Sequence, residues 1–197
     1  MSRTGRVVVL NGTASAGKTS LAAAIREHAS GMCVVLAQDD FAANLIPSWV
    51  TVDGAFDGAN GGDGFRFVRD AAGLHVEVGP VGARLLRGYR DAVAACARAG
   101  NDVLVDECKF DADGWNEWNR ALDGVASMWV RVECDLAECE RRERARPDRR
   151  LLVGLARGHD ARAHADVRYD LVVDLTDGDL DRGARSVLDA IGRTAIG

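Results

Sequence analysis

A phosphate-binding loop is the sequence feature that most constrains this chain. Residues 12–19 read GTASAGKT, which fits the pattern G-x-x-x-x-G-K-[ST] in full, and the apolar run 7–10 stands directly before it. This pattern occurs between a buried strand and a helix, where glycines let backbone N–H groups wrap around a phosphate chain. The motif therefore predicts a strand, a loop that binds nucleotide phosphates, and a helix whose N-terminus faces them.

Positions within the loop have expected roles. Lys18 supplies a positive charge to the β- and γ-phosphates, and the Thr19 hydroxyl is an expected ligand of Mg²⁺. Only two of the 25 basic residues are lysines, so a lysine would rarely fall on the motif position by chance. The alternative is a glycine-rich turn that binds no ligand. The residues expected to bind the nucleotide are Gly12, Thr13, Ala14, Ser15, Ala16, Gly17, Lys18, Thr19 and Ser20.

The rest of the chain alternates between strand-like and helix-like segments, which is typical of α/β proteins. This alternation predicts a five-stranded parallel sheet with helices on both faces, in one P-loop domain over residues 1–197. Strands are expected at 6–11, 32–37, 102–106, 127–133 and 171–174, with helices at 19–29, 81–99, about 111–122, 136–145, 151–165 and 179–193. An insert at about 48–80 is expected to hold a glycine-rich loop and a small β-hairpin.

Charge and composition exclude several other classes of protein. The net charge is −5 and no long basic block occurs, which argues against a nucleic-acid partner. No run of 18 apolar residues is present, so no membrane span is expected. The N-terminus has no signal-peptide pattern, and the five cysteines are odd in number and form no C-x-x-C pair. We therefore expect reduced thiols and a cytoplasmic location.

Acidic residues follow two of the predicted strands. Ligands of parallel sheets bind outside the carboxyl ends of the strands, so Gly12, Asp39 and Asp106 are expected to converge on one cleft. Asp106 and Glu107 are expected to hold Mg²⁺, directly or through water. A helix cap or a solvated loop acid is the alternative, and Glu107 could instead orient a water molecule, as in an ATPase.

Asp39 and Asp40 are the candidates for proton transfer. In phosphoryl transfer to a hydroxyl, an acid near the γ-phosphate accepts the hydroxyl proton. Asp39 is nearer to the end of its strand and is the expected base. Asp40 is assigned to the acceptor side, with a helix cap as its alternative role.

Two further groups of residues are expected to flank the cleft. The segment 140–150 carries six arginines around a proline and is expected to form a lid, at about 142–151, that folds over a triphosphate. Its alternative is a solvated helix with ion pairs such as Glu138–Arg142 and Glu140–Arg144. The aromatic residues Trp49, Phe65 and Phe67 are expected to wall an organic acceptor, although they could simply cover a sheet edge.

These motifs together resemble the chloramphenicol phosphotransferase family, whose members are P-loop kinases that phosphorylate a small-molecule hydroxyl with ATP. The similar stretches cover nearly the whole chain and include VVVLNGTASAGKTS, ARAGNDVLVDE, RVECDLAE, RRERARPDR and YDLVVDLT. The resemblance implies a fold like that of the nucleoside-monophosphate kinases. It also implies Asp39 as the base and Arg142, Arg146 and Arg149 as catalytic lid arginines.

The chain departs from the family pattern mainly on the acceptor side. Asp40 stands where the family often has a small hydroxyl residue, and Glu107 replaces a second aspartate. ATP use with Mg²⁺ is therefore a firmer expectation than chloramphenicol as the substrate. The leading hypothesis is an ATP-dependent O-phosphotransferase acting on a small antibiotic-like hydroxyl acceptor, in resistance or self-protection. The alternatives are a kinase of an ordinary metabolite or nucleoside and a nucleotide-binding switch or ATPase; the oligomeric state is left open.

Overall fold

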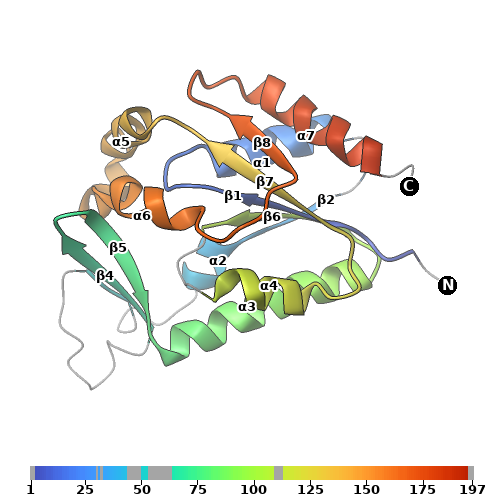
Figure 1. Ribbon diagram of the computed structural model, residues 1–197, viewed down its shortest axis with the longest axis horizontal. Coiled ribbons are helices and arrows are strands. Elements are labelled where there is room, and N and C mark those ends of the chain that lie inside the picture. Colours follow the sequence, from blue (N-terminus) through green and yellow to red (C-terminus); the bar gives the residue numbers. More distant parts are fainter. Residues whose placement is uncertain are drawn as a thin grey trace.

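The main sheet has five parallel strands in the order β2-β6-β1-β7-β8 (Figure 1). The computed structural model describes residues 3–29, 31, 33–43, 50–52, 64–108 and 113–194. The strands are β1 (Val7–Asn11), β2 (Cys33–Ala37), β6 (Asp102–Glu107), β7 (Ser127–Glu133) and β8 (Leu171–Asp174). The expected five-stranded parallel sheet is therefore confirmed, with the strand before the phosphate loop at its centre.

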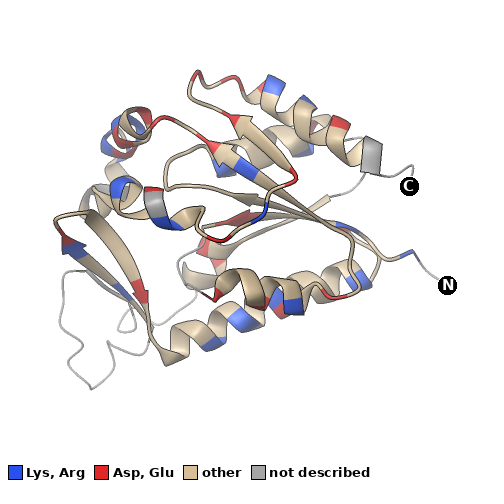
Figure 2. Cartoon of the chain, viewed as in Figure 1, with Lys and Arg blue, Asp and Glu red and all other residues tan. Residues whose placement is uncertain are grey.

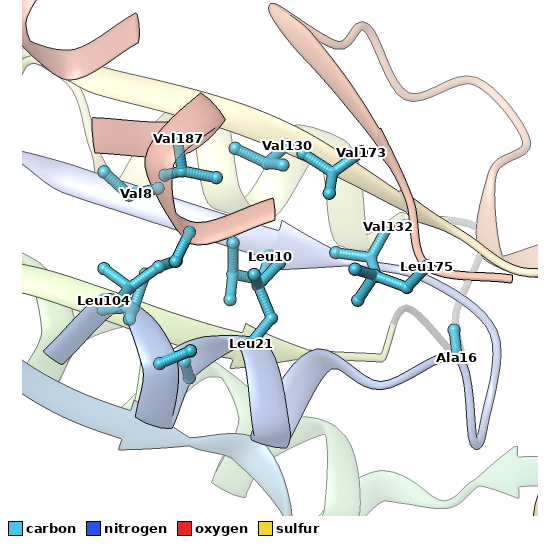
Figure 3. Packing of buried hydrophobic residues seen from close by; sticks show 14 of the residues in the cluster. Val8, Leu10, Ala16, Leu21, Leu104, Val130, Val132, Val173, Leu175 and Val187 are labelled. Atoms are coloured by element: carbon cyan, nitrogen blue, oxygen red, sulfur yellow. The ribbon is translucent and has the colours of Figure 1, made fainter. Parts of the chain in front are cut away.

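Alternation along β1 builds a separate core on each face of the sheet. Val8 and Leu10 pack beneath α1 (Lys18–His28) and α7 (Leu180–Thr194), as Figure 3 shows. Val7 and Val9 face the other way and pack against α3 (Pro80–Arg98) and α4 (Gly114–Ala121), which lie below the sheet in Figure 1. Because β1 is apolar on both faces, it is buried along its whole length, as a central parallel strand requires.

A second, small sheet lies beside the main one and consists of β3 (Val50–Val52), β4 (Phe65–Asp70) and β5 (Gly73–Val78). The expected hairpin is confirmed as the antiparallel pair β4–β5. β3, which pairs with β4 in parallel, was not expected, because a three-residue strand in a glycine-rich stretch carries little periodicity. Phe65, Leu74 and Val76 of this small sheet form a third core with Leu86 and Leu155.

The helices that complete the cleft are α2 (Gln38–Ala43), α5 (Leu136–Arg144) and α6 (Leu155–Ala163). The helix expected over 151–165 begins only at Leu155. A 3₁₀ turn, η2 (Pro147–Leu152), precedes it, and Gly154 takes a left-handed conformation with φ of 102°. Within the described ranges, no helix combines the length and apolar character that crossing a membrane would require.

Candidate active site

The phosphate loop joins β1 to α1 and needs glycine at two of its positions. A Cβ at Gly12 would lie 2.4 Å from the carbonyl oxygen of Val132, so β7 approaches too closely for any side chain there. Gly17 has φ of 106° and stands at the N-cap of α1, a conformation that favours glycine. The loop therefore ends on the N-terminus of α1, where backbone N–H groups remain available for an anion.

Lys18 and Thr19 are held at the mouth of this loop. The Lys18 Nζ donates to the carbonyl oxygens of Gly12 and Thr13 at 2.7 and 2.9 Å. The Thr19 Oγ1 donates to Asp106 Oδ2 at 2.5 Å, which joins α1 to the end of β6. A hydroxyl and a carboxylate are hard oxygen ligands of the kind that Mg²⁺ takes in small number beside substrate phosphates.

Glu107 faces away from this pair, so the structure does not bring Asp106 and Glu107 together at one point, as their expected joint role at a cation would suggest. Successive side chains of a strand point to opposite faces of the sheet, and both residues lie within β6. Glu107 is 1% exposed, and Gln38, with its amide nitrogen turned toward it, donates to both carboxylate oxygens at 2.7 and 2.9 Å. Asp106 with Thr19 is thus the pair that fits a cation.

A cavity of about 630 Å³ opens over the phosphate loop. It brings together groups that lie far apart in the sequence. The cavity lining includes the following residues that were expected at the site: Ala14, Ser15, Gly17, Lys18, Thr19, Ser20, Asp39, Asp106, Arg142 and Arg146. Gly12, Thr13 and Ala16 are buried in the loop behind this surface. Carboxylates, a lysine and arginines therefore meet at the carboxyl ends of the strands, as the fold class predicts.

Asp39 and Asp40 open α2 but differ in what they reach. Both side chains are exposed, but Asp39 lines the cavity and Asp40 is not part of its described lining. The two carboxylates follow β2 directly, and β2 is bonded to β6, which carries Asp106. Of this acidic pair, only Asp39 is placed to contact a group bound in the cavity.

The arginines of α5 and the turn after it approach the cavity from the β7 side. Arg142 donates to the carbonyl oxygens of Ala16 at 3.3 Å and Leu175 at 2.8 Å, and it pairs with Glu138 at 2.8 Å. It therefore braces the phosphate loop as well as lining the cavity. Arg146 is exposed at the cavity edge, and the side chain of Arg149 lies outside the described residues.

Ion pairs along α5 confirm part of the alternative interpretation of this segment. Figure 2 shows basic and acidic residues interspersed there, and the pairs Glu138–Arg142 and Glu140–Arg144 both form. Glu138 also accepts from Arg141 at 2.6 Å. Hydrogen bonds from Arg141 and Arg142 lower the pKa of Glu138 to about 2. The arginines thus serve the helix surface and the cavity together.

Several lining residues were not expected from the sequence, and Cys108, Leu155 and His159 are among them. The Cys108 Sγ lies 3.4 Å from His159 Nδ1. Burial, then the charges of Lys18 and Arg162, lower the pKa of His159 to about 3, so the imidazole is neutral near pH 7. Cys108 directly follows the carboxyl end of β6, and this position in the sequence could have predicted that it lies at the cavity. His159 has no such signal, because only tertiary packing brings α6 to the cavity.

The aromatic residues assigned to the acceptor are placed differently from that expectation. Phe65 is 3% exposed and packs in the core of the small sheet, and Phe67 packs against the same core. Neither is part of the described cavity lining, whereas Leu155, which belongs to that core, is. Trp49 lies outside the described residues. The small sheet therefore supports the cavity wall through Leu155.

Charge is distributed unevenly around the phosphate loop. β2 and β7 lie on opposite sides of β1, so α2 and α5, which follow them, flank the loop from opposite sides. The α5 side supplies arginines, and the α2 side supplies Asp39, with Cys108 and His159 nearby in the lining. Positive side chains therefore border the cavity on the α5 side, and a carboxylate borders it on the α2 side.

A family model and several known proteins match this chain. The model described as chloramphenicol phosphotransferase-like protein matches residues 5–192. A protein of Mycobacterium tuberculosis (strain ATCC 25618 / H37Rv) named "Putative O-phosphotransferase" is 29% identical over 182 residues, covering 87% of this chain and 76% of that protein. A relative with the same name, identity and coverage occurs in strain CDC 1551 / Oshkosh.

Solved structures show the same fold. The APS kinase CysC of Mycobacterium tuberculosis, in complex with AMPPNP and APS, superposes with a TM-score of 0.66 at 20% identity and covers 96% of this chain and 99% of that chain. A sugar kinase from Janibacter sp. HTCC2649 superposes with a TM-score of 0.65 at 12% identity, covering 95% of each chain. The fold is therefore that of the P-loop kinases.

Proposed function

The chain belongs to the chloramphenicol phosphotransferase-like family and is an O-phosphotransferase, and from this premise we propose that it transfers the γ-phosphoryl group of ATP to a hydroxyl of an uncharged small molecule, such as an antibiotic. The observation that carries the proposal is the meeting of Lys18, Asp39 and the Thr19–Asp106 pair in one cavity over the phosphate loop. Each of these groups has a distinct task in phosphoryl transfer.

Mg²⁺ fits the oxygen ligands at the loop. Thr19 Oγ1 and Asp106 Oδ2 are 2.5 Å apart, and among the described residues no cluster of three or more acidic, His or Cys side chains could hold a metal alone. Such a sparse protein contribution suits Mg²⁺, which is commonly bound by one or two protein ligands together with substrate phosphates. When bound there, Mg²⁺ would neutralise charge on the phosphate oxygens.

The chain's own residues account for the transfer. Asp39 accepts the proton of the acceptor hydroxyl while the hydroxyl oxygen forms a bond to the γ-phosphorus. The bond between the γ-phosphorus and the bridging oxygen breaks, and ADP leaves with that oxygen. Lys18 and the loop N–H groups stabilise the charge on the phosphates. Arg142 keeps the loop in place from the α5 side, and Arg146 supplies a further positive charge at the cavity edge.

The α2 side of the cavity favours an uncharged acceptor. An anionic acceptor would need positive side chains that contact it, and the described residues that line the cavity beside Asp39 are Cys108, Leu155 and the neutral His159, with Arg162 close to His159 but not part of the lining. Of the nearby arginines in the small sheet, Arg66 pairs with Glu77 and Arg69 binds the carbonyl oxygen of Val153. Inactivation of an antibiotic would follow if its phosphate blocked binding to the target.

A matched pair of variants, Asp39→Asn and Asp40→Asn, tests the proposal. ATP consumption is first measured with uncharged hydroxyl-bearing antibiotics, nucleosides and sugar phosphates. With the acceptor found, Asp39→Asn should lower kcat by about 10²–10⁴, because the general base is lost, and should leave ATP affinity nearly unchanged. Asp40→Asn, which removes a charge one residue away and outside the described lining, should retain most activity.

Three outcomes would contradict the proposal. ATP turnover independent of any acceptor would favour an ATPase. In an ATPase Glu107 would have to orient the attacking water, yet its carboxylate faces the Gln38 amide. Turnover only with sugar phosphates would favour a metabolite kinase. A loss of activity in Asp40→Asn alone would place the base one residue further along α2.

A further inference from the structure

Arg69 joins the small sheet to the turn between α5 and α6. Its Nη1 donates to the carbonyl oxygen of Val153 at 2.7 Å, and its Nη2 to that of Leu151 at 3.5 Å. Both carbonyl groups lie at the end of the arginine-rich segment, which we define as residues 141–153. One exposed side chain of β4 thus binds two carbonyl groups of a segment whose first residues, Arg141 to Arg146, include four that line the cavity.

Gly154 fixes the same junction from two directions. Its N–H donates to Glu143 Oε2 of α5 at 2.7 Å, and its carbonyl oxygen accepts from the Leu74 N–H of β5 at 2.9 Å. Glu143 is 3% exposed, so its carboxylate accepts the Gly154 N–H away from solvent. The chain therefore runs from α5 through Gly154 to the small sheet by direct hydrogen bonds.

Close backbone contact makes this junction stiff. A Cβ at Gly158 of α6 would lie 1.9 Å from the carbonyl oxygen of Leu74, and a Cβ at Gly73 would lie 2.7 Å from that of Gly154. With no side chain between the two backbones, β5 and α6 have little room to slide past one another. A displacement of the small sheet must then displace the start of α6.

We propose that Arg69 is a positioning residue that makes the small sheet and the arginine-rich segment shift together. The inference rests on the proposed function, which puts the acceptor on the side supported by the small sheet and the nucleotide beside the arginines. Arg69 is not part of the described cavity lining, and its guanidinium binds carbonyl groups of the segment. By thermodynamic linkage, nucleotide binding at the segment and acceptor binding beside the small sheet then raise each other's affinity.

Amide hydrogen exchange of the full chain tests this coupling, with AMPPNP and Mg²⁺ as the probe. In the wild type, AMPPNP should slow exchange in residues 12–20, in 147–156 and also in 69–76. In Arg69→Ala without nucleotide, exchange in 147–153 should rise about three- to tenfold, because an exposed hydrogen-bonding side chain is lost. In that variant AMPPNP should still protect 12–20, but its protection of 69–76 should be weaker than in the wild type, because only the contacts through Gly154 and Gly158 remain.

Two companion variants control for the loss of an arginine. Arg66→Ala removes an arginine three residues earlier in β4 that pairs with Glu77 inside the small sheet, and it should keep the wild-type pattern. Arg69→Lys, which can still donate to one carbonyl group, should restore part of the protection of 69–76. Two results would overturn this inference and leave the proposed function standing. In the first, AMPPNP protects 12–20 of the wild type but not 69–76; in the second, Arg69→Ala shows the same exchange as the wild type. If AMPPNP protects no part of 12–20, the proposed function falls and the inference with it.

Discussion

The imidazole of His159 is a buried group whose protonation state affects both the cavity and the stability of the protein. Its pKa of about 3 in the folded chain compares with 6.5 for an unperturbed histidine, chiefly because it is buried. Between pH 3 and pH 6.5, His159 is protonated in the unfolded chain and neutral in the folded chain. The free energy of unfolding is therefore at its full value above pH 6.5 and falls as the pH drops toward 3.

We expect the variant His159→Phe to lose this acid sensitivity. At pH 5, the wild type should have lost about 2 kcal/mol of its free energy of unfolding through His159, since each pH unit below 6.5 corresponds to about 1.4 kcal/mol. Urea unfolding at pH 5 and pH 7.5 measures the loss in both proteins, and the difference between them isolates His159 from other titrating groups. Equal losses in the two proteins would show that His159 is not held neutral by burial.

At the scale of elements, the carboxylate of Glu143 joins the end of α5 to the start of α6. It accepts from the N–H groups of Gly154 and Ala156 at 2.7 and 2.9 Å while almost fully buried. A carboxylate at a helix N-terminus also meets the positive end of the helix dipole. This one side chain thus satisfies two of the N–H groups that α6 leaves without partners in its own first turn.

Glu143→Gln should accordingly destabilise the protein by roughly 1–3 kcal/mol, because the amide keeps one acceptor oxygen and loses the charge. Urea unfolding at pH 7 gives the free-energy difference. Glu140→Gln is the matched control on the same helix, since Glu140 pairs with the exposed Arg157 and should cost less than about 1 kcal/mol. Equal effects of the two variants would mean that Glu143 adds no more than a surface ion pair.

Most elements of the main sheet could be predicted from the sequence, because their patterns are local. The apolar run before the loop predicts β1, and β7 spans the expected residues 127–133. Glu107 was expected beside Asp106 at a cation, but the two-residue period of a strand places the two side chains on opposite faces of the sheet. The position of His159 at the cavity and the pairing of β3 with β4 depend on contacts between segments that are distant in the sequence. No local sequence pattern predicts such contacts.

At the scale of the whole molecule, the site lies where the two halves of the main sheet meet. β1 is bonded to β6 on one side and β7 on the other, and it carries the phosphate loop at its carboxyl end. The cores on both faces of the sheet contain residues of β1 and so lie directly behind that loop. A ligand bound at the loop should therefore stabilise the main sheet as a unit.

Nucleotide binding should raise the melting temperature of the whole protein. At a concentration of 100 times its Kd, AMPPNP with Mg²⁺ would add about 2.7 kcal/mol of stability, which for a chain of this size is about 5–10 °C in Tm. Without ligand, Lys18→Ala should melt only a few degrees below the wild type, because it removes two buried hydrogen bonds to loop carbonyl groups and leaves both main-sheet cores intact. At the same AMPPNP concentration its shift should be nearly absent.

Adding EDTA to the wild-type complex should reduce the shift, since Thr19 and Asp106 would lose the cation that joins them to the phosphates. A full shift in Lys18→Ala would mean that nucleotide binds elsewhere, and a full shift in EDTA would remove the metal from the proposed site.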